Sequence, residues 1–258
     1  MSFKNALILL SLFCVSNIWA QRIINYGIYD RPTSDAQAEA LANIFAQRHP
    51  QRDFFYTDVR DDLDVETILA NATGSPYVDT TFKRCRIIYQ NEETGYAFYR
   101  FNAHNNEIEL RETPTAAKTF SLNIDAKISI KDLETGEILM LKRVEEKDQV
   151  SNAYVNLLES INGLTLFRRT YIKFTEGREA TSSMVVATKD KFTVYEDYFL
   201  EREGSKTLVL LKQNKKSIYE LFEEDKAAIK TLIKTKSLDV KKESDLITLI
   251  QEISKFGV

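Results

Sequence analysis

The sequence predicts an α+β protein in which a mostly antiparallel, curved sheet is followed by three short amphipathic helices. Two changes of pattern support this prediction. From residue 74 onward, apolar and polar residues alternate in short runs, which is typical of half-buried strands. After residue 212, the apolar residues recur at helical spacing instead. The sheet is expected to form a half-barrel or a meander, and one further helix is expected near the N-terminus.

The strands are expected to pair with their neighbours in sequence, because turn-rich stretches separate the alternating runs. The joints NEETG, AHNN and DLETG contain Gly, Asn and Asp, which tight turns favour. Strands joined by such short turns pair in antiparallel fashion. The expected strands are residues 82–90, 96–102, 107–111, 120–130, 137–144, 153–159, 164–175, 183–188, 191–201 and 206–212.

Three apolar stripes predict the C-terminal helices. Ser217 and Glu220 have the spacing of a capping box, which predicts a helix start there. Each stripe needs a surface to cover, and the preceding sheet is the obvious candidate. The lysines between residues 212 and 242 are interspersed with acids, which favours a solvated helix face over a binding patch. The stripes are Ile218, Leu221 and Phe222; Ile229, Leu232 and Ile233; and Leu246, Leu249, Ile250 and Ile253.

Residues 1–20 have the pattern of a cleaved secretory signal. Lys4 precedes an apolar run that is too short to cross a bilayer. Ala20 suits the −1 position of a signal-peptidase site, so cleavage is expected directly after it. We therefore expect an exported protein, periplasmic or extracellular, whose mature chain has no transmembrane segment.

The mature chain is expected to have two parts. Residues 21–73 are partly irregular and contain one helix, in which Ser34 and Gln37 form a capping-box pair and Pro50 ends the apolar run. Residues 74–258 are expected to form the antiparallel sheet and its helical cap.

Composition argues against several classes of function. The formal net charge of −3 argues against a nucleic-acid partner, which normally requires a clustered basic face. Cys85 is the single cysteine after the signal, so we expect a small buried apolar residue and no internal disulfide. His49 and His104 lack the spacing of a zinc site. Since no phosphate-binding loop, nucleophile elbow or dinucleotide fingerprint occurs, we expect no cofactor, metal or identifiable catalytic residue.

The stretch RFNAHNNEIEL holds the one candidate site, which is either a ligand site or a hairpin turn. Alternation of apolar and polar residues fails at Ala103 and resumes at Glu107. Asparagine tolerates left-handed backbone and bonds its own backbone, so the composition favours the turn. In such a hairpin, Arg100 is expected to face Glu107 or Glu109. The candidate surface turn consists of His104, Asn105, Asn106 and Glu107.

Several motifs together resemble a group of exported, uncharacterised proteins that is common in Bacteroidetes. The motifs are GSPYVDTTF, YRFNAHNNEIEL, YEDYFLEREG and the lysine-rich helical tail. The resemblance covers residues 74 to 250 and leaves residues 21–73 unmatched. The family often has Tyr-Asn and Asp in the central turn, where this chain has Phe101-Asn102 and Asn106. The resemblance implies export and brings no activity, cofactor or catalytic residue.

Three functions follow as hypotheses. The leading one is a non-catalytic envelope or secreted protein whose curved sheet binds an apolar ligand or a partner protein. This hypothesis depends on the abundance of aromatic and aliphatic residues in the strands, which a filled core explains equally well. The second is a carboxylate-dependent hydrolase acting on envelope or extracellular polymers, and the third is a pure protein-interaction module.

Overall fold

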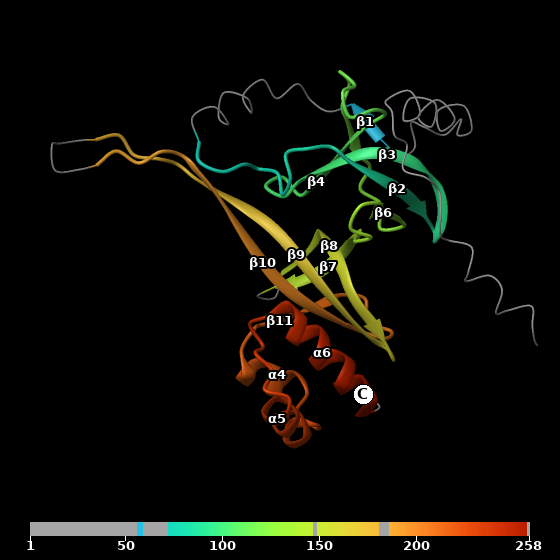
Figure 1. Ribbon diagram of the computed structural model, residues 1–258, viewed down its shortest axis with the longest axis vertical. Coiled ribbons are helices and arrows are strands. Elements are labelled where there is room, and N and C mark those ends of the chain that lie inside the picture. The colour runs from blue at the N-terminus through green and yellow to red at the C-terminus, as the bar shows by residue number, and fades with distance from the viewer. Residues whose placement is uncertain (1–55, 59–71, 147–148, 181–185, 257–258) are drawn as a thin grey trace, which may run out of the picture. The chain divides into compact units, whose positions relative to one another are not determined.

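A computed structural model describes residues 56–58, 72–146, 149–180 and 186–256 (Figure 1). The described residues all belong to one unit of the chain, Glu39–Val258. The expected cleavage after Ala20 and the expected helix between Ser34 and Pro50 lie outside the described residues.

The described residues form a mostly antiparallel eleven-stranded sheet followed by three α-helices, which confirms the α+β class. The strand order is β1-β5-β4-β3-β2-β6-β7-β11-β10-β9-β8, with an additional pairing between β7 and β8. The strands are β1 (Tyr56–Asp58), β2 (Lys83–Tyr89), β3 (Glu92–Asn102), β4 (Glu107–Arg111), β5 (Phe120–Leu122), β6 (Ile128–Asp132), β7 (Ile138–Glu146), β8 (Gln149–Ile161), β9 (Leu164–Thr175), β10 (Lys191–Arg202) and β11 (Leu208–Leu211).

Strands β7 to β11 pair in a closed ring. Each strand from β7 to β10 pairs antiparallel with the next one. The ring closes where β11 returns to β7, with Leu208 opposite Val144 in a parallel pairing. Strand β7 connects the ring to the preceding strands, because its beginning pairs with β6 and its end pairs with β11.

Side chains fill the inside of this ring. Phe167 and Phe199 are fully buried there and pack with smaller residues from β7, β8 and β11. The ion pair between Lys142 Nζ and Glu201, at 2.9 Å, joins β7 to β10, and Lys142 Nζ lies 5.2 Å from the centre of the Phe167 ring. The buried members of this cluster are Val144, Ala153, Val155, Phe167, Phe199 and Leu208.

A second core lies between the strands that precede the ring and the opposite face of β8 and β9. It joins apolar residues of β2, β3, β4 and β6 to Tyr154 and Ile172. Cys85 belongs to this core and is fully buried, as the sequence predicts, and burial raises the pKa of its thiol.

The three expected helices follow the ring, and a third core joins them to it. They are α4 (Lys215–Leu221), α5 (Lys226–Thr235) and α6 (Glu243–Ile253), with a short 3-10 turn, η1 (Ser254–Phe256), at the end. Helix α6 buries Leu246, Leu249, Ile250 and Ile253 in a cluster that includes Leu164 and Leu166 of β9. The apolar stripes therefore cover the sheet, as predicted.

Local details correct three expectations. The run 120–130 is two strands, because Asp125 forms a turn in which its side chain accepts a 2.8 Å hydrogen bond from the Lys127 N–H. Helix α4 begins earlier than predicted: Asn214, and not Ser217, is its N-cap, and its side chain accepts from the Ser217 N–H at 2.8 Å. In the expected strand 183–188, the described residues 186–188 contain only an isolated bridge between Thr188 and Arg178.

Candidate binding cleft between strands β8 and β9

Strands β8 and β9 pair over only part of their length. They begin as a hairpin at Asn162 and Gly163, which both have positive φ, and their pairing extends to Asn156 opposite Arg168. Beyond that point, β8 pairs with β7 alone and β9 pairs with β10 alone among the described residues. Two strand edges that belong to one hairpin therefore separate and leave a gap between them.

The turn between β3 and β4 lies in this gap and bonds to the edge of β8. Asn106 has a φ of 55°, the left-handed conformation that its residue type tolerates. Its side-chain oxygen accepts a 2.9 Å hydrogen bond from the Tyr154 N–H, and its side-chain nitrogen donates to the Asn152 carbonyl at 3.2 Å. One amide side chain thus makes the two bonds that a neighbouring strand would make.

The same turn bonds to the edge of β9. The Ile172 N–H donates to the Ala103 carbonyl at 3.1 Å, and Nδ1 of His104 lies 3.2 Å from the Ile172 carbonyl. The His104 ring also meets the rings of Phe174 and Phe192 edge-on, with centroids 6.4 and 5.6 Å away. His104 is exposed, and its imidazole contacts Ile172, Phe174 and Phe192.

The other residues of the candidate turn hold its shape. The backbone N–H groups of His104 and Asn105 donate to the side-chain oxygen of Asn102, at 3.2 and 3.1 Å. Glu107 begins β4 and pairs with Asn102. Arg100 faces Glu109, one of its two expected partners. The turn therefore brings His104 and Asn106 to the gap, while Asn105 and Glu107 serve the hairpin.

A cleft of about 850 Å³ lies beside the turn, at the end of the ring where β8 and β9 separate. Arg169 of β9 is largely buried in it and binds two carboxylates. Its Nη2 atom lies 2.5 Å from Glu146 of β7 and 2.7 Å from Asp197 of β10. Its Nε atom is buried and has no hydrogen-bond partner. The Arg169 guanidinium also lies 5.2 Å from the centre of the Phe199 aromatic ring. The ion cluster therefore borders the apolar interior of the strand ring.

Aromatic rings continue this surface along β9 and β10. Tyr171 and Tyr195 are stacked, with their centroids 5.4 Å apart. Lys173 Nζ lies 5.5 and 5.3 Å from the two ring centres. Burial and the charge of Asp197 raise the pKa of Tyr171. Tyr171 and Lys173 line the cleft together with Gln149, Val150 and Ser151 of β8.

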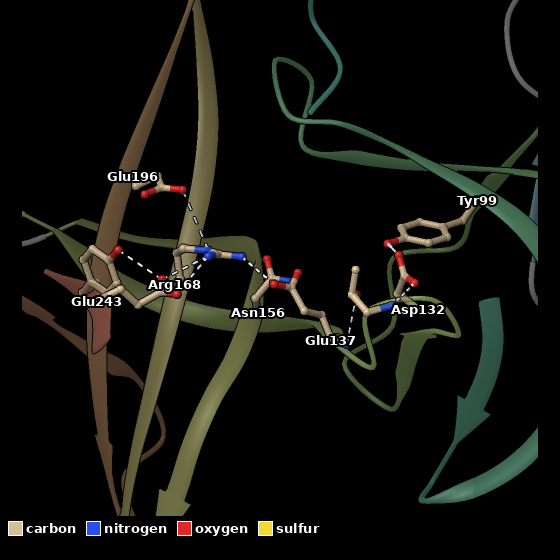
Figure 2. A network of polar contacts seen from close by, with 9 residues as sticks. Tyr99, Asp132, Glu137, Asn156, Arg168, Glu196 and Glu243 are labelled. Atoms are coloured by element: carbon tan, nitrogen blue, oxygen red, sulfur yellow. Dashed lines mark hydrogen bonds and ion pairs between the residues drawn. The ribbon is translucent and has the colours of Figure 1, made fainter. Parts of the chain in front are cut away.

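A separate polar network lies on the opposite face of β9, where successive side chains alternate in direction (Figure 2). Arg168 donates to Glu137 before β7 and to Glu243 of α6, each at 3.0 Å. Tyr198 also donates to Glu243, at 3.1 Å, and burial raises its pKa. Arg168 lines a polar cavity of about 100 Å³ next to this network. The contacts tie helix α6 to the sheet, and we assign this network a structural role.

Asp132 also lines that cavity, and its carboxylate accepts three hydrogen bonds. It accepts from Tyr99 Oη at 2.8 Å, and from the backbone N–H groups of Glu134 and Thr135 at 2.7 and 2.9 Å. Asp132 is buried, and the pKa of Tyr99 is raised by burial and by the Asp132 charge. These bonds close the turn that precedes β7, so Asp132 also has a structural role.

Sequence reasoning found the turn but missed Arg169 and its carboxylates. Glu146, Arg169 and Asp197 come from three strands, and no short motif contains them. The one available signal is a charged residue inside an apolar strand, as Arg169 is two residues after Phe167.

Comparison of the chain with family models, with curated proteins and with solved structures finds no match. Within the described residues, no helix has the length and apolar character needed to cross a membrane. No group of three or more His, Cys, Asp or Glu side chains there is arranged to hold a metal ion.

Proposed function

We propose that this chain is an exported, non-catalytic binding protein of the cell envelope or the extracellular medium. Its curved sheet binds a segment of a partner protein in the cleft between β8 and β9. The signal-like residues 1–20 and the resemblance to exported proteins support export. The separation of β8 from β9 supports binding, because it leaves strand edges and polar side chains exposed in a concave site.

That separation carries the proposal, and it favours a protein partner over an apolar ligand. The interior of the ring is filled by Phe167, Phe199 and their neighbours. The cleft at its end is lined by charged and polar groups together with two tyrosines close by. Polypeptides present such mixed chemistry, whereas an apolar ligand needs an enclosed apolar pocket.

The convergence of Glu146 and Asp197 on one arginine bears on the hydrolase alternative. A carboxylate pair that hydrolyses a glycoside needs one member to hold a proton and the other to face the substrate. Here both carboxylates accept hydrogen bonds from Arg169 Nη2. The arrangement suits a structural ion cluster better than a catalytic pair.

Peptide selection tests the binding function. Random dodecapeptides displayed on phage would be panned against protein purified from cells that express the whole chain, and photo-cross-linkers would then locate the bound peptides. A cross-linker at Val150, 49% exposed beside the cleft, is expected to capture them, and one at the control position Ile124, 77% exposed, is not. The proposal fails if no peptide is selected, or if capture at Ile124 equals that at Val150.

Intact-mass measurement of the exported protein tests export. The expected mass corresponds to a chain that begins at Gln21, with no lipid attached. A diacyl adduct on Cys14, or a full-length chain retained in the cytoplasm, would contradict this part of the proposal.

A further inference from the structure

We infer that the partner segment binds as an added β-strand on the open edge of β8, with an acidic side chain directed at Lys173. This inference rests on the proposed function and specifies how the cleft is used. Strand addition joins a peptide to a sheet through main-chain hydrogen bonds, while pockets and charges beside the edge select its side chains.

The direction of the β8 backbone is established by its bond to the turn. The N–H and C=O groups of one strand residue point to the same side, and alternate residues point the same way. Tyr154 donates its N–H to Asn106, away from β7. Asn152 and Val150 therefore also direct their backbone groups away from β7 and toward the cleft. Asn152 uses its carbonyl to bind Asn106, which leaves its N–H and both backbone groups of Val150 for a partner.

The β3–β4 turn shows that the exposed edges of β8 and β9 form hydrogen bonds like those of a neighbouring strand. Asn106 occupies the deeper part of the edge with two strand-like hydrogen bonds, and the Ala103 carbonyl accepts one hydrogen bond from Ile172 of β9. The cleft continues outward from there along β8. A peptide bound at Val150 would continue, two residues further along β8, the row of hydrogen bonds that Asn106 begins at Tyr154 and Asn152. Exposed strand edges pair readily with added strands, and Val150 itself is 49% exposed.

Charge identifies the side chain that the segment should carry. Glu146, Arg169 and Asp197 neutralise one another in part, because they form one ion cluster. Lys173 is the charged cleft residue for which the described part of the chain provides no ion pair. A glutamate or aspartate on the added strand would supply the missing carboxylate.

A peptide series tests the main-chain part of the inference. The probe is a fluorescein-labelled nonapeptide that alternates threonine with valine and has a glutamate at its centre. N-methylation at one amide at a time removes one donor. We expect the one amide that donates to the Val150 carbonyl to be sensitive, with a loss of at least tenfold in affinity, and the two neighbouring amides, which point away from β8, to be insensitive. Equal sensitivity at all positions would overturn strand addition.

Substitutions on β8 test the location. Val150→Pro removes the N–H that faces the cleft and leaves the pairing with β7, which strand edges tolerate. Val150→Ala keeps the N–H and is the matched control. Anisotropy titrations should show at least tenfold weaker binding for Val150→Pro and less than threefold change for Val150→Ala, with unchanged melting temperatures. Equal binding by both variants would overturn the inference.

A charge exchange tests the role of Lys173. Lys173→Glu should weaken binding of the glutamate probe at least tenfold, and a probe with lysine at its centre should bind this variant and not the unmutated protein. If the exchange fails, the inferred preference for an acidic side chain is wrong.

A dimer that Val150→Pro converts to a monomer would show that a second copy occupies the edge, which would also overturn the inference. Peptides selected by panning that show no single sensitive amide on N-methylation would leave the proposed function intact and refute strand addition alone.

Discussion

The side-chain oxygen of Asn106 accepts a hydrogen bond from the backbone N–H of Tyr154, at 2.9 Å. The two residues belong to different hairpins, and this bond joins the β3–β4 turn to the edge of β8. The bond from Asn106 to the Asn152 carbonyl completes the pair. Asn106 is therefore both the turn residue that the sequence predicts and a substitute for a strand residue.

Asn106→Gly should destabilise the protein by about 1–3 kcal/mol, because the variant keeps the left-handed turn and leaves two backbone groups of β8 without partners. Urea unfolding measures the change. Asn91→Gly is the matched control, since Asn91 has a φ of 68° in an exposed turn, and we expect a change of less than about 0.5 kcal/mol there. Equal effects at both positions would mean that the contact with β8 adds nothing.

Arg100→Ala should cost about 3–5 kcal/mol, because it leaves a buried carboxylate without its cation. Glu109 is 5% exposed, and Arg100 donates to it from two nitrogens, one of them at 3.1 Å. Expectation from the sequence alone is a mild effect unless the pair is covered, and the structure shows that it is covered. Lys216→Ala, at the exposed pair with Glu220, should change stability by less than about 0.5 kcal/mol in the same unfolding assay. A loss below about 1 kcal/mol for Arg100→Ala would contradict the burial of the pair.

Tyr77 should make stability fall at alkaline pH. Its hydroxyl donates to Glu109 at 2.9 Å, and burial together with the Glu109 charge raises its pKa from 10.0 to about 12. Below pH 10 this contribution is complete. Between pH 10 and about 12 the unfolded chain ionises its tyrosine while the folded chain does not, so the free energy of unfolding falls by up to about 1.4 kcal/mol per pH unit.

Tyr77→Phe isolates this contribution, because Tyr99, Tyr154 and Tyr198 also have raised pKa values and remain in the variant. Denaturant unfolding at a series of pH values should give a shallower alkaline decline for Tyr77→Phe than for the unmutated protein. Identical slopes would show that Tyr77 is not shielded in the folded state.

Leu249→Ala should destabilise the protein by about 2–5 kcal/mol, as expected for a truncated core leucine. Leu249 is 1% exposed in the cluster that joins α6 to β9. Leu232, which belongs to the predicted stripe, is only partly buried, so Leu232→Ala should have a smaller effect. Thermal unfolding measures the change. An unchanged melting temperature for Leu249→Ala would contradict a core shared by α6 and β9.

Local patterns account for what the sequence predicts well. Alternation in β9 and β10, the Asn162–Gly163 turn and the stripes of α5 and α6 depend on residues close in sequence. The ring does not, because its closure requires β11 to pair with β7 across the whole of β8, β9 and β10. That parallel pairing leaves no mark in the spacing of either short strand.

In the candidate site, too, the sequence predicts the local turn and not the contacts between distant strands. Asparagines predict the turn at 103–106, and Asn106 has the positive φ that such turns require. Its contact with β8 lies beyond a register shift between Leu157 and Glu159 and beyond the last pair of the hairpin, Asn156 opposite Arg168. The sequence predicts residues 153–159 as one continuous strand and does not locate the shift within it. The contact of His104 with Ile172 lies in the gap that the separation of β8 from β9 leaves, whereas Asp197 faces Arg169 directly in the pairing of β9 with β10.

Amide hydrogen exchange along β8 in the purified whole chain tests the central claim most directly. The Tyr154 amide should exchange slowly, because Asn106 binds it, while the amides of Val150 and Asn152 should exchange quickly because they face the open cleft. Addition of the nonapeptide probe should slow exchange at Val150 and Asn152 and leave Tyr154 unchanged. If Val150 and Asn152 are already protected in the free protein, the edge of β8 is occupied and is not a binding site.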